Sequence, residues 1–565
     1  LRISRVLFLL PQMMQRRSDS AVLLMFYHNV RLGLGGRVWR GKATATARLT
    51  APTPPTSTPP PGTMLLLLDD ILVLVVDFLQ TRILSQTCRR AWQLLRRRYV
   101  RYWVGQENIQ KVAESLLQSK AYAVHLSVPS DSWRRTSKID FGNDTQIQAL
   151  ASLKAAQVRI LSLDLAFSKV GDAGAQVLAS LKETPHLHTL SLDLSSNGIG
   201  DPGAQTLASL KKVPKLNTLR LNLCAGSVRT IPIRAAGAEA LASLKEALLL
   251  HTLSLGLSDL GIGDDEAQIL ASLREAPLLR NLSLNLSAIF ISDNLVGDAG
   301  AEALASLKKA PLLQTLILDL SMNRIGDAGA QALASLKEAP FLHTLIFYLS
   351  HNKFGNAGAA ALATLKEALS LRTLGLYLSN NAIGDAGAHA LASLNEAPLL
   401  HSLTLCLSNN MQHAVKIEDA GARSLASLQG SPFLHTLCLD LSGNRIGNAG
   451  AKALAGLNTA PLLHTLTLDL SDNRIGAAGA EALAGLNTAP LLHTLSLDLR
   501  DRGLTGSCNC IGDAGAQALA SLKDTPLLHT LSLHLAGTAI GDDKAHALEN
   551  SLKEASLLHT ITLYV

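Results

Sequence analysis

The stretch PLLHTLTLDLSDNRIG, residues 461–476, recurs with small changes through most of this 565-residue chain. Leucines alternate with polar residues over its LTLDL segment, a period of two that predicts a strand with one apolar face. The segment that follows, such as IGDAGAQALASLKEAP at 325–340, has Ala and Leu at helical spacing. Asp327 suits the N-cap of that helix, and Pro340 ends it. Each unit is therefore predicted to contain a strand, a turn, a helix and a loop that leads back to the next strand.

The strand phrase occurs fourteen times, with a basic step of 29 residues. One such unit cannot bury its apolar face alone, whereas stacked units form a parallel sheet backed by helices. The sequence therefore predicts an α/β solenoid, and the alternation of strands and helices excludes all-helical repeats. The aligned units begin at Val158, Leu187, Leu216, Leu250, Leu279, Leu313, Leu342, Leu371, Leu400, Leu434, Leu463, Leu492, Leu528 and Leu558.

An asparagine follows the strand in many of these units. An Asn side chain at this place can bond the backbone of its own turn and that of the next repeat. We therefore predict a structural role, rather than a catalytic one, for this set. Its members are Asn197, Asn323, Asn352, Asn381, Asn410, Asn444 and Asn473.

The combination of LxxLxL, Asn and IGDAGA-x-ALA closely resembles the ribonuclease-inhibitor-like class of leucine-rich repeats. That class is also seen in GTPase-activating proteins for Ran and in NOD-like receptors. The resemblance covers residues 158–565 and implies a curved horseshoe of about fourteen repeats, with parallel strands on the concave face and helices on the convex face. Because this architecture carries many different partners, the resemblance alone names none of them.

Three segments are expected before the repeats. Residues 1–63 are irregular and basic and end in the Pro/Thr-rich linker TAPTPPTSTPPPGT, so we expect them to be disordered. Residues 64–104 are predicted to be a helical, F-box-like segment. Residues 105–157 are predicted to be a helical N-terminal cap of the solenoid, which then occupies residues 158–565.

Residues 67–98, LLDDILVLVVDFLQTRILSQTCRRAWQLLRRR, resemble an F-box. They depart from its pattern where Leu68 replaces a proline and where the spacing to Cys88 and Trp92 differs. The resemblance implies docking to a Skp-type adaptor of a cullin ubiquitin ligase, with the repeats selecting the substrate. The alternative is an amphipathic helical pair that caps the first repeat. The residues implied in adaptor binding are Asp70, Ile71, Leu72, Val75, Leu79 and Trp92.

The charge is distributed unevenly. Residues 1–138 hold 21 Lys/Arg and 7 Asp/Glu, whereas the whole chain holds 51 and 44, so the repeats are mildly acidic. An acidic solenoid is a poor general nucleic-acid binder, and we predict no nucleic-acid partner. The most apolar run, residues 64–76, is shorter than the ~20 residues that a membrane span needs, so no membrane association is predicted.

The six cysteines are scattered, a pattern typical of a reducing compartment, so we expect a cytoplasmic or nuclear protein. Cys508 and Cys510 are the only close pair, and we predict a loop with two free thiols there rather than a metal or redox site. The sequence has no HExxH, GxSxG or zinc-type spacing. We therefore predict no enzyme activity, no catalytic residues, no cofactor and no metal site.

Binding is expected on the outward positions of the strands, which form the concave surface. An aromatic pair lies at the middle of the array with acidic positions on both sides, and large anchors ringed by polar groups are typical of interface hot spots. We predict that a partner with basic and apolar features docks there. The predicted contact residues are Asp193, Asp319, Phe347, Tyr348, Tyr377, Asp440, Asp469 and Asp498.

Two further features concern the edges of the array. Insertions at 226–233, 289–294, 411–416 and 502–509 would project from one rim, where they either bind a partner or reflect neutral drift. The final phrase TITLYV has no polar capping unit, so either the sequence is truncated there or the C-terminal repeat associates with another copy of the chain.

A histidine precedes the strand in nine units. These histidines could form an edge that responds to pH or binds metal ions. Alternatively, each is a framework residue that bonds the neighbouring turn, and we favour this framework role. The members are His188, His251, His343, His401, His435, His464, His493, His529 and His559.

Together these features predict a non-enzymatic scaffold that binds a protein partner. The alternative is an F-box-type substrate receptor of a cullin ubiquitin ligase. A third reading is a regulator similar to the GTPase-activating proteins, which would need a reactive Arg or Asn loop at the rim.

Overall fold

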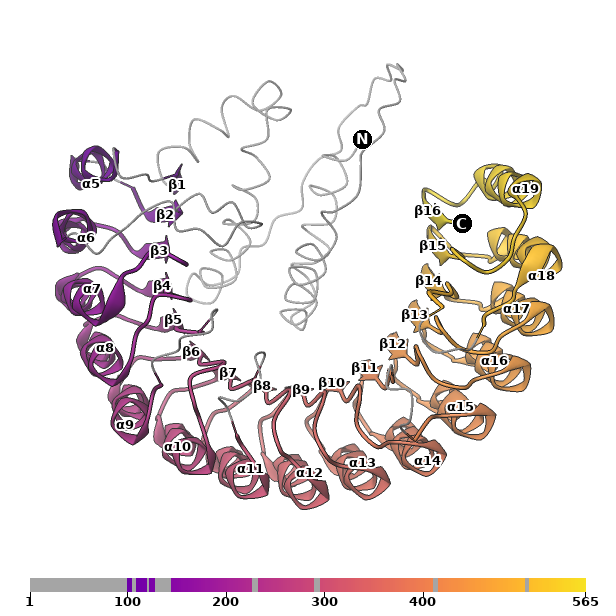
Figure 1. The fold of residues 1–565 in the computed structure, drawn as a ribbon, viewed down its shortest axis with the longest axis horizontal. Helices are drawn as coiled ribbons and strands as arrows, with labels where there is room; N and C mark the ends of the chain where they lie inside the picture. The colour runs from indigo at the N-terminus through magenta and orange to yellow at the C-terminus, as the bar shows by residue number, and fades with distance from the viewer. Residues whose placement is uncertain are drawn as a thin grey trace, which may run out of the picture. The chain divides into compact units, whose positions relative to one another are not determined.

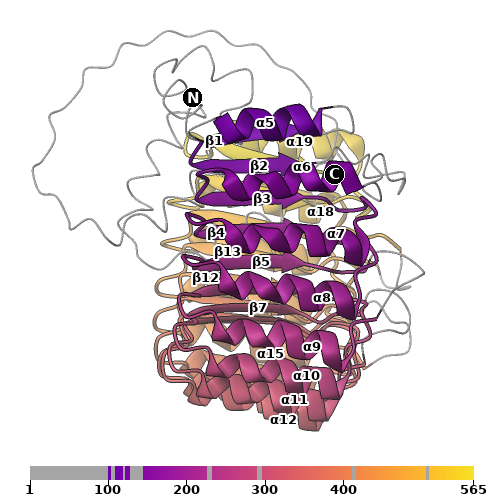
Figure 2. The ribbon, with the colours of Figure 1, turned by 90° about the vertical axis from the view of Figure 1, so that its left-hand side faces the viewer.

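The computed structural model describes residues 99–103, 108–118, 121–127, 144–225, 232–288, 295–409, 415–503 and 508–565, all within the unit Arg96–Val565. These residues form one parallel sheet of sixteen strands that follow one another in chain order. Within this unit the strands line the inner side of an arc and the helices line its outer side (Figure 1). Seen from the side, the helices stack one per repeat (Figure 2).

The strands are five residues long. They are β1 Tyr99–Trp103, β2 Ala123–Ser127, β3 Ile160–Asp164, β4 Thr189–Asp193, β5 Thr218–Asn222, β6 Thr252–Gly256, β7 Asn281–Asn285, β8 Thr315–Asp319, β9 Thr344–Tyr348, β10 Thr373–Tyr377, β11 Ser402–Cys406, β12 Thr436–Asp440, β13 Thr465–Asp469, β14 Thr494–Asp498, β15 Thr530–His534 and β16 Thr560–Tyr564.

The helices alternate with the strands, and from α6 to α18 each runs into a short 3-10 turn. They are α5 Ile109–Gln118, α6 Asp144–Ala151, α7 Gly171–Leu178, α8 Asp201–Leu207, α9 Ala235–Ala242, α10 Asp264–Leu270, α11 Asp298–Ala305, α12 Asp327–Ala334, α13 Asn356–Ala363, α14 Asp385–Ala392, α15 Asp419–Ala426, α16 Asn448–Ala455, α17 Ala477–Ala484, α18 Gly512–Leu519 and α19 Asp542–Lys553.

The leucine alternation confirms the predicted strands. In β4, Leu190 and Leu192 are buried, whereas Ser191 and Asp193 on the other face are partly accessible. Each fully buried leucine contributes about 1.5–3 kcal/mol relative to an exposed one. The same residues repeat in register from strand to strand, so the leucines of all units join one continuous core between sheet and helices.

The strand-following asparagines have the predicted structural role. The side-chain Nδ2 of Asn473 donates to the carbonyls of Leu470 at 3.0 Å and Leu441 at 3.0 Å, and its Oδ1 accepts from the N–H of Ile446 at 3.0 Å. The bonded repeat is the preceding one rather than the next. Similar inter-repeat bonds are made by Asn197, Asn323, Asn352, Asn381 and Asn444, whereas Asn410 lies outside the described residues.

The predicted N-cap role of Asp327 for its own helix is wrong. Gly326 is the N-cap of α12, and it makes no side-chain cap bond. Asp327 lies one residue inside, and its Oδ1 accepts from the N–H groups of Gly355 at 2.8 Å and Gly358 at 2.7 Å in the next repeat. Because the first N–H groups of a helix have no intrahelical partner, a carboxylate from the neighbouring repeat satisfies them. The aspartate thus links successive helices.

The predicted helical cap over 105–157 is only partly correct. That range contains α5 and α6, but it also contains β2, and β1 lies within the predicted helical segment 64–104. Val124 and Leu126 of β2 are buried and lie opposite Leu161 and Leu163 of β3. The sheet therefore begins two strands, β1 and β2, before the fourteen predicted units. Val100 and Val124 stand where the first strand leucine is found in later repeats, and Tyr102 of β1 stands where the second is found, so the leucine pattern is weaker there.

Candidate protein-interaction surface

The candidate surface is the column formed by the last residue of each strand, on the inner side of the sheet. Parallel pairing brings these residues into register, with neighbours about 4.8 Å apart. The sheet therefore aligns all the predicted contact residues except Phe347. From β8 to β16 the column consists of Asp319, Tyr348, Tyr377, Cys406, Asp440, Asp469, Asp498, His534 and Tyr564.

Tyr348 and Tyr377 form a stacked pair at the middle of the column. Their ring centroids lie 4.3 Å apart with an interplanar angle of 20°. Both side chains are half-buried, and burial raises the pKa of each hydroxyl above its usual range. Gly375 lies beside the pair, and its missing side chain leaves open the space next to the Tyr377 ring, where an added Cβ would be 3.4 Å from Cε2. The pair is thus a preformed aromatic platform.

Phe347 does not belong to this surface. Its side chain is 0% exposed and packs within the leucine core. It occupies the strand position that Leu376 occupies in the next strand, so the two-residue period directs it inward. The prediction that Phe347 contacts a partner is wrong.

One oxygen of each aspartate in the column closes the turn after its strand. Oδ1 of Asp440 accepts from the N–H of Ser442 at 3.0 Å, and Oδ1 of Asp469 accepts from that of Ser471 at 2.9 Å. These bonds hold the carboxylates in place without a partner. The corresponding bonds are made at Asp193, Asp319 and Asp498.

Three carboxylates follow one another at the ends of β12, β13 and β14. Burial raises the pKa of Asp440 and of Asp498, and the neighbouring carboxylate of Asp469 raises both further. The pKa of Asp498 reaches about 6, although Arg500 opposes the shift with its Nη2 at 2.9 Å from the carboxylate. A cationic side chain placed over these residues would relieve the repulsion between them.

The raised pKa of Asp498 predicts a pH-dependent gain in stability for Asp498→Asn. The folded pKa lies above the usual value near 4, so the folded state binds the proton more tightly, and stability falls as pH rises from about 4 to about 6. After allowing for solvent screening, the variant should be about 1–2 kcal/mol more stable than the wild type at pH 7.5. Denaturant titrations at pH 4 and 7.5 measure this; an equal difference at both values would contradict it.

One residue near the end of the column was missed by the sequence analysis. Arg500 takes the place of the serine found in most units, and it pairs with Asp498. The substitution of Arg for Ser in LDLR, residues 497–500, was the signal that could have identified it. His534 continues the column, with Nδ1 3.6 Å from Asp498 Oδ2 and its ring in edge contact with Tyr564 at 4.3 Å.

The histidine edge forms a ladder of rings from His401 to His529, with neighbouring centroids 5.1–5.5 Å apart. Nδ1 of His464 lies 2.6 Å from the carbonyl of Leu462, two residues earlier in its own turn, and His401, His435 and His493 make the same contact. This supports the framework role, although the bond is made to its own turn and not to the neighbouring one. The rings from His401 to His529 are within 17° of parallel, so their lone pairs do not converge on one point.

Most of the predicted rim insertions lie outside the described residues. Two that are partly described contain unexpected bonds. Buried Lys416 donates from Nζ to the carbonyls of Asn409 and Gly443. These bonds hold the end of the 411–416 insertion against its start and against the next repeat. Cys508 and Cys510 are joined in a disulfide, so the prediction of two free thiols is wrong.

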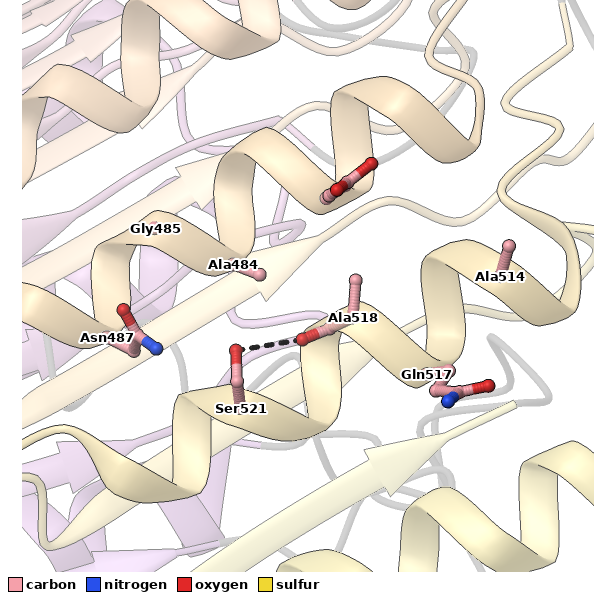
Figure 3. Close-up of a pocket in the computed structure, with 8 residues that line it drawn as sticks. Ala484, Gly485, Asn487, Ala514, Gln517, Ala518 and Ser521 are labelled. Carbon is pink, nitrogen blue, oxygen red and sulfur yellow. Dashed lines mark hydrogen bonds between the residues drawn. The ribbon is translucent and has the colours of Figure 1, made fainter.

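A shallow groove of about 650 Å³ lies on the outer side, between α17 and α18 (Figure 3). Its lining consists of small and polar side chains, and Ser521 Oγ donates to the carbonyl of Ala518 at 2.9 Å. Over the described ranges, no group of three or more His, Cys, Asp or Glu side chains is arranged to hold a metal ion. None of the described helices has the length and apolarity that crossing a membrane requires.

The predicted adaptor-binding residues Asp70, Ile71, Leu72, Val75, Leu79 and Trp92 all lie outside the described residues. Adaptor binding through them therefore stays a prediction.

Comparison with known proteins identifies the repeated units as leucine-rich repeats. A model of the Leucine Rich repeat family matches residues 160–179, 186–208, 314–334, 344–363, 372–392, 436–455, 463–484 and 507–520. Matching solved structures include the crystal structure of an internalin from Listeria monocytogenes, at 19% identity, covering 68% of this chain and 89% of that one with a TM-score of 0.36. No curated protein matches. The chain carries leucine-rich repeats, and its described residues form a leucine-rich-repeat solenoid.

Proposed function

We propose that this protein is a non-enzymatic scaffold that binds a protein partner on the inner face of its repeats and their loop rim. The observation that carries the proposal is the stacked Tyr348–Tyr377 pair, half-buried at the middle of the strand-end column. Aromatic side chains that are already ordered lose little conformational entropy on binding and are enriched among interface hot spots.

The chemistry around the pair indicates what the partner contributes. Asp319 adjoins Tyr348 on one side, and the carboxylates from Asp440 to Asp498 follow beyond Cys406 on the other. Aromatic faces attract cations, and the carboxylates add a complementary charge. We therefore infer a partner segment that combines apolar and basic side chains. A cytoplasmic or nuclear location for this interaction remains part of the proposal.

Replacing Tyr348 and Tyr377 together by alanine should lower partner recovery at least about tenfold, because the hot-spot area is removed. The measurement is quantitative affinity purification with the full-length chain. Phe341→Ala is the matched control, since this aromatic is 48% exposed but precedes β9, whereas Tyr348 is the last residue of that strand. Unchanged recovery with the double variant, in protein whose circular dichroism matches the wild type, would contradict the proposal.

The second candidate is an F-box-type substrate receptor, which the motif at 67–98 favours. Here the repeats would select a substrate and a Skp-type adaptor would bind residues 64–104. Recovery of a cullin-type complex only when residues 67–98 are present, in chains that all keep β1, distinguishes this candidate from a simple scaffold. The third, a regulator similar to GTPase-activating proteins, would need a reactive Arg or Asn at the loop rim, and none of the described rim residues is singled out for that role.

A further inference from the structure

The disulfide between Cys508 and Cys510 encloses a single residue, Asn509. Both cysteines are exposed, whereas the side chain of Asn509 is 0% exposed. A thiol in solution can therefore reach the sulfur atoms, while the residue between them is part of the protein interior.

Asn509 bonds the backbone of two repeats in the same way as the strand-following asparagines. We call this set of asparagines the asparagine ladder. Its Nδ2 donates to the carbonyls of Leu470 at 2.8 Å and Leu499 at 3.0 Å. Its Oδ1 accepts from the N–H of Ile475 at 2.9 Å. These are the bonds that Asn473 makes one repeat earlier, with Leu441, Leu470 and Ile446 in the equivalent places.

The two asparagines reach their places by chain segments of different length. Asn473 follows Leu470 by three residues, whereas Asn509 follows Leu499 by ten. A longer connection costs more conformational entropy when its end is fixed. A covalent link across Asn509 restricts the chain on both sides of it and offsets part of this cost.

Further bonds join the same loop to the rest of the turn. The N–H of Asn509 donates to Asp501 Oδ2 at 3.2 Å, and the N–H of Arg502 donates to Asp472 Oδ1 at 2.6 Å in the preceding repeat. The bonds at Asn509 and at Arg502 thus connect this loop to the preceding repeat.

We propose that the Cys508–Cys510 disulfide is a redox-sensitive latch that holds Asn509 in the ladder between repeats. A dithiol reductant opens it by thiol–disulfide exchange: the protein disulfide gains two electrons and two protons and becomes two thiols, and the dithiol becomes a cyclic disulfide. Opening loosens the bonds from Asn509 to Leu470 and Ile475, and reoxidation restores them. This inference is independent of the proposed function, because it concerns contacts within the chain.

Hydrogen exchange of the full-length protein tests the latch with and without dithiothreitol. After reduction, the Ile475 amide should exchange at least about tenfold faster, since its acceptor is Asn509. The Ile446 amide, whose acceptor is Asn473, is the matched control and should not change. Alkylation and mass measurement count the thiols before and after treatment.

Two variants complete the experiment. Cys508→Ser/Cys510→Ser should show fast exchange at Ile475 with or without reductant, whereas Cys438→Ser should respond as the wild type does. Should the double variant fail to fold, reversible reduction and reoxidation of the wild type still decides the question. The proposal is overturned if oxidised protein contains no such disulfide, if Ile475 is unaffected by its opening, or if Ile446 accelerates equally.

Discussion

Replacing Asn473 by alanine should lower the free energy of unfolding by about 3–5 kcal/mol. The side chain is 0% exposed and bonds backbone groups of two repeats, including the carbonyls of Leu441 and Leu470 and the N–H of Ile446. Alanine leaves these groups unsatisfied in the interior, and each such group costs about 1–3 kcal/mol. Because each repeat contacts only its neighbours, the loss should be concentrated in the units around β12 and β13.

Denaturant titration gives the global effect, and hydrogen exchange of the Ile446 amide gives the local one. Asn487→Ala is the matched control, because Asn487 lies on the outer side, where it lines the shallow groove. That substitution should change stability by less than about 1 kcal/mol. Similar losses for the two variants would show that the ladder contributes little.

A methyl group added at Gly329 should destabilise the protein by about 2–4 kcal/mol. The new Cβ would lie 2.5 Å from Asp298 Oδ1 and 2.8 Å from Ile325 Cγ2. The same Asp298 oxygen accepts from the N–H of Gly329 at 2.9 Å, so the carboxylate cannot move away without losing the bond that links α11 to α12. Thermal and denaturant unfolding of Gly329→Ala measure the loss.

Gly485 supplies the matched control for this substitution. It follows α17 with a helical φ of −58°, and an added Cβ would meet nothing within 4 Å. Gly485→Ala should therefore be neutral or stabilise by up to about 1 kcal/mol, because alanine reduces the freedom of the unfolded chain. Equal losses at the two positions would show that the clash with Asp298 is not what excludes alanine.

Residues whose role depends on near neighbours in the chain were predictable from the sequence, and residues bonded to distant repeats were not. The leucine pattern of β4 and the bonding of Asn473 were predictable, because alternation and turn chemistry act within a few residues. The period also placed Phe347 inward, and its proximity to Tyr348 was the misleading feature. Asp327 was placed wrongly because its donors lie 28 and 31 residues further along the chain.

The candidate surface was predicted in outline. The sequence alone placed Tyr348, Tyr377 and the aspartates in one column, since a constant repeat implies a constant register. It could not predict the 4.3 Å stacking of the tyrosines, the raised pKa of Asp498 or the pairing with Arg500. These depend on how closely adjacent strands approach and on how much water reaches the column.

The amino-acid sequence by itself determined the strand–helix unit, the number of units from residue 158 onward and which leucines are buried. These follow from periods along the chain, which hold for any packing of the repeats. Only the tertiary structure decided that Asp327 caps the following helix and that Asn509, ten residues beyond Leu499, completes the ladder. Such bonds join residues that are distant in the chain, so they exist only once the repeats are stacked in register.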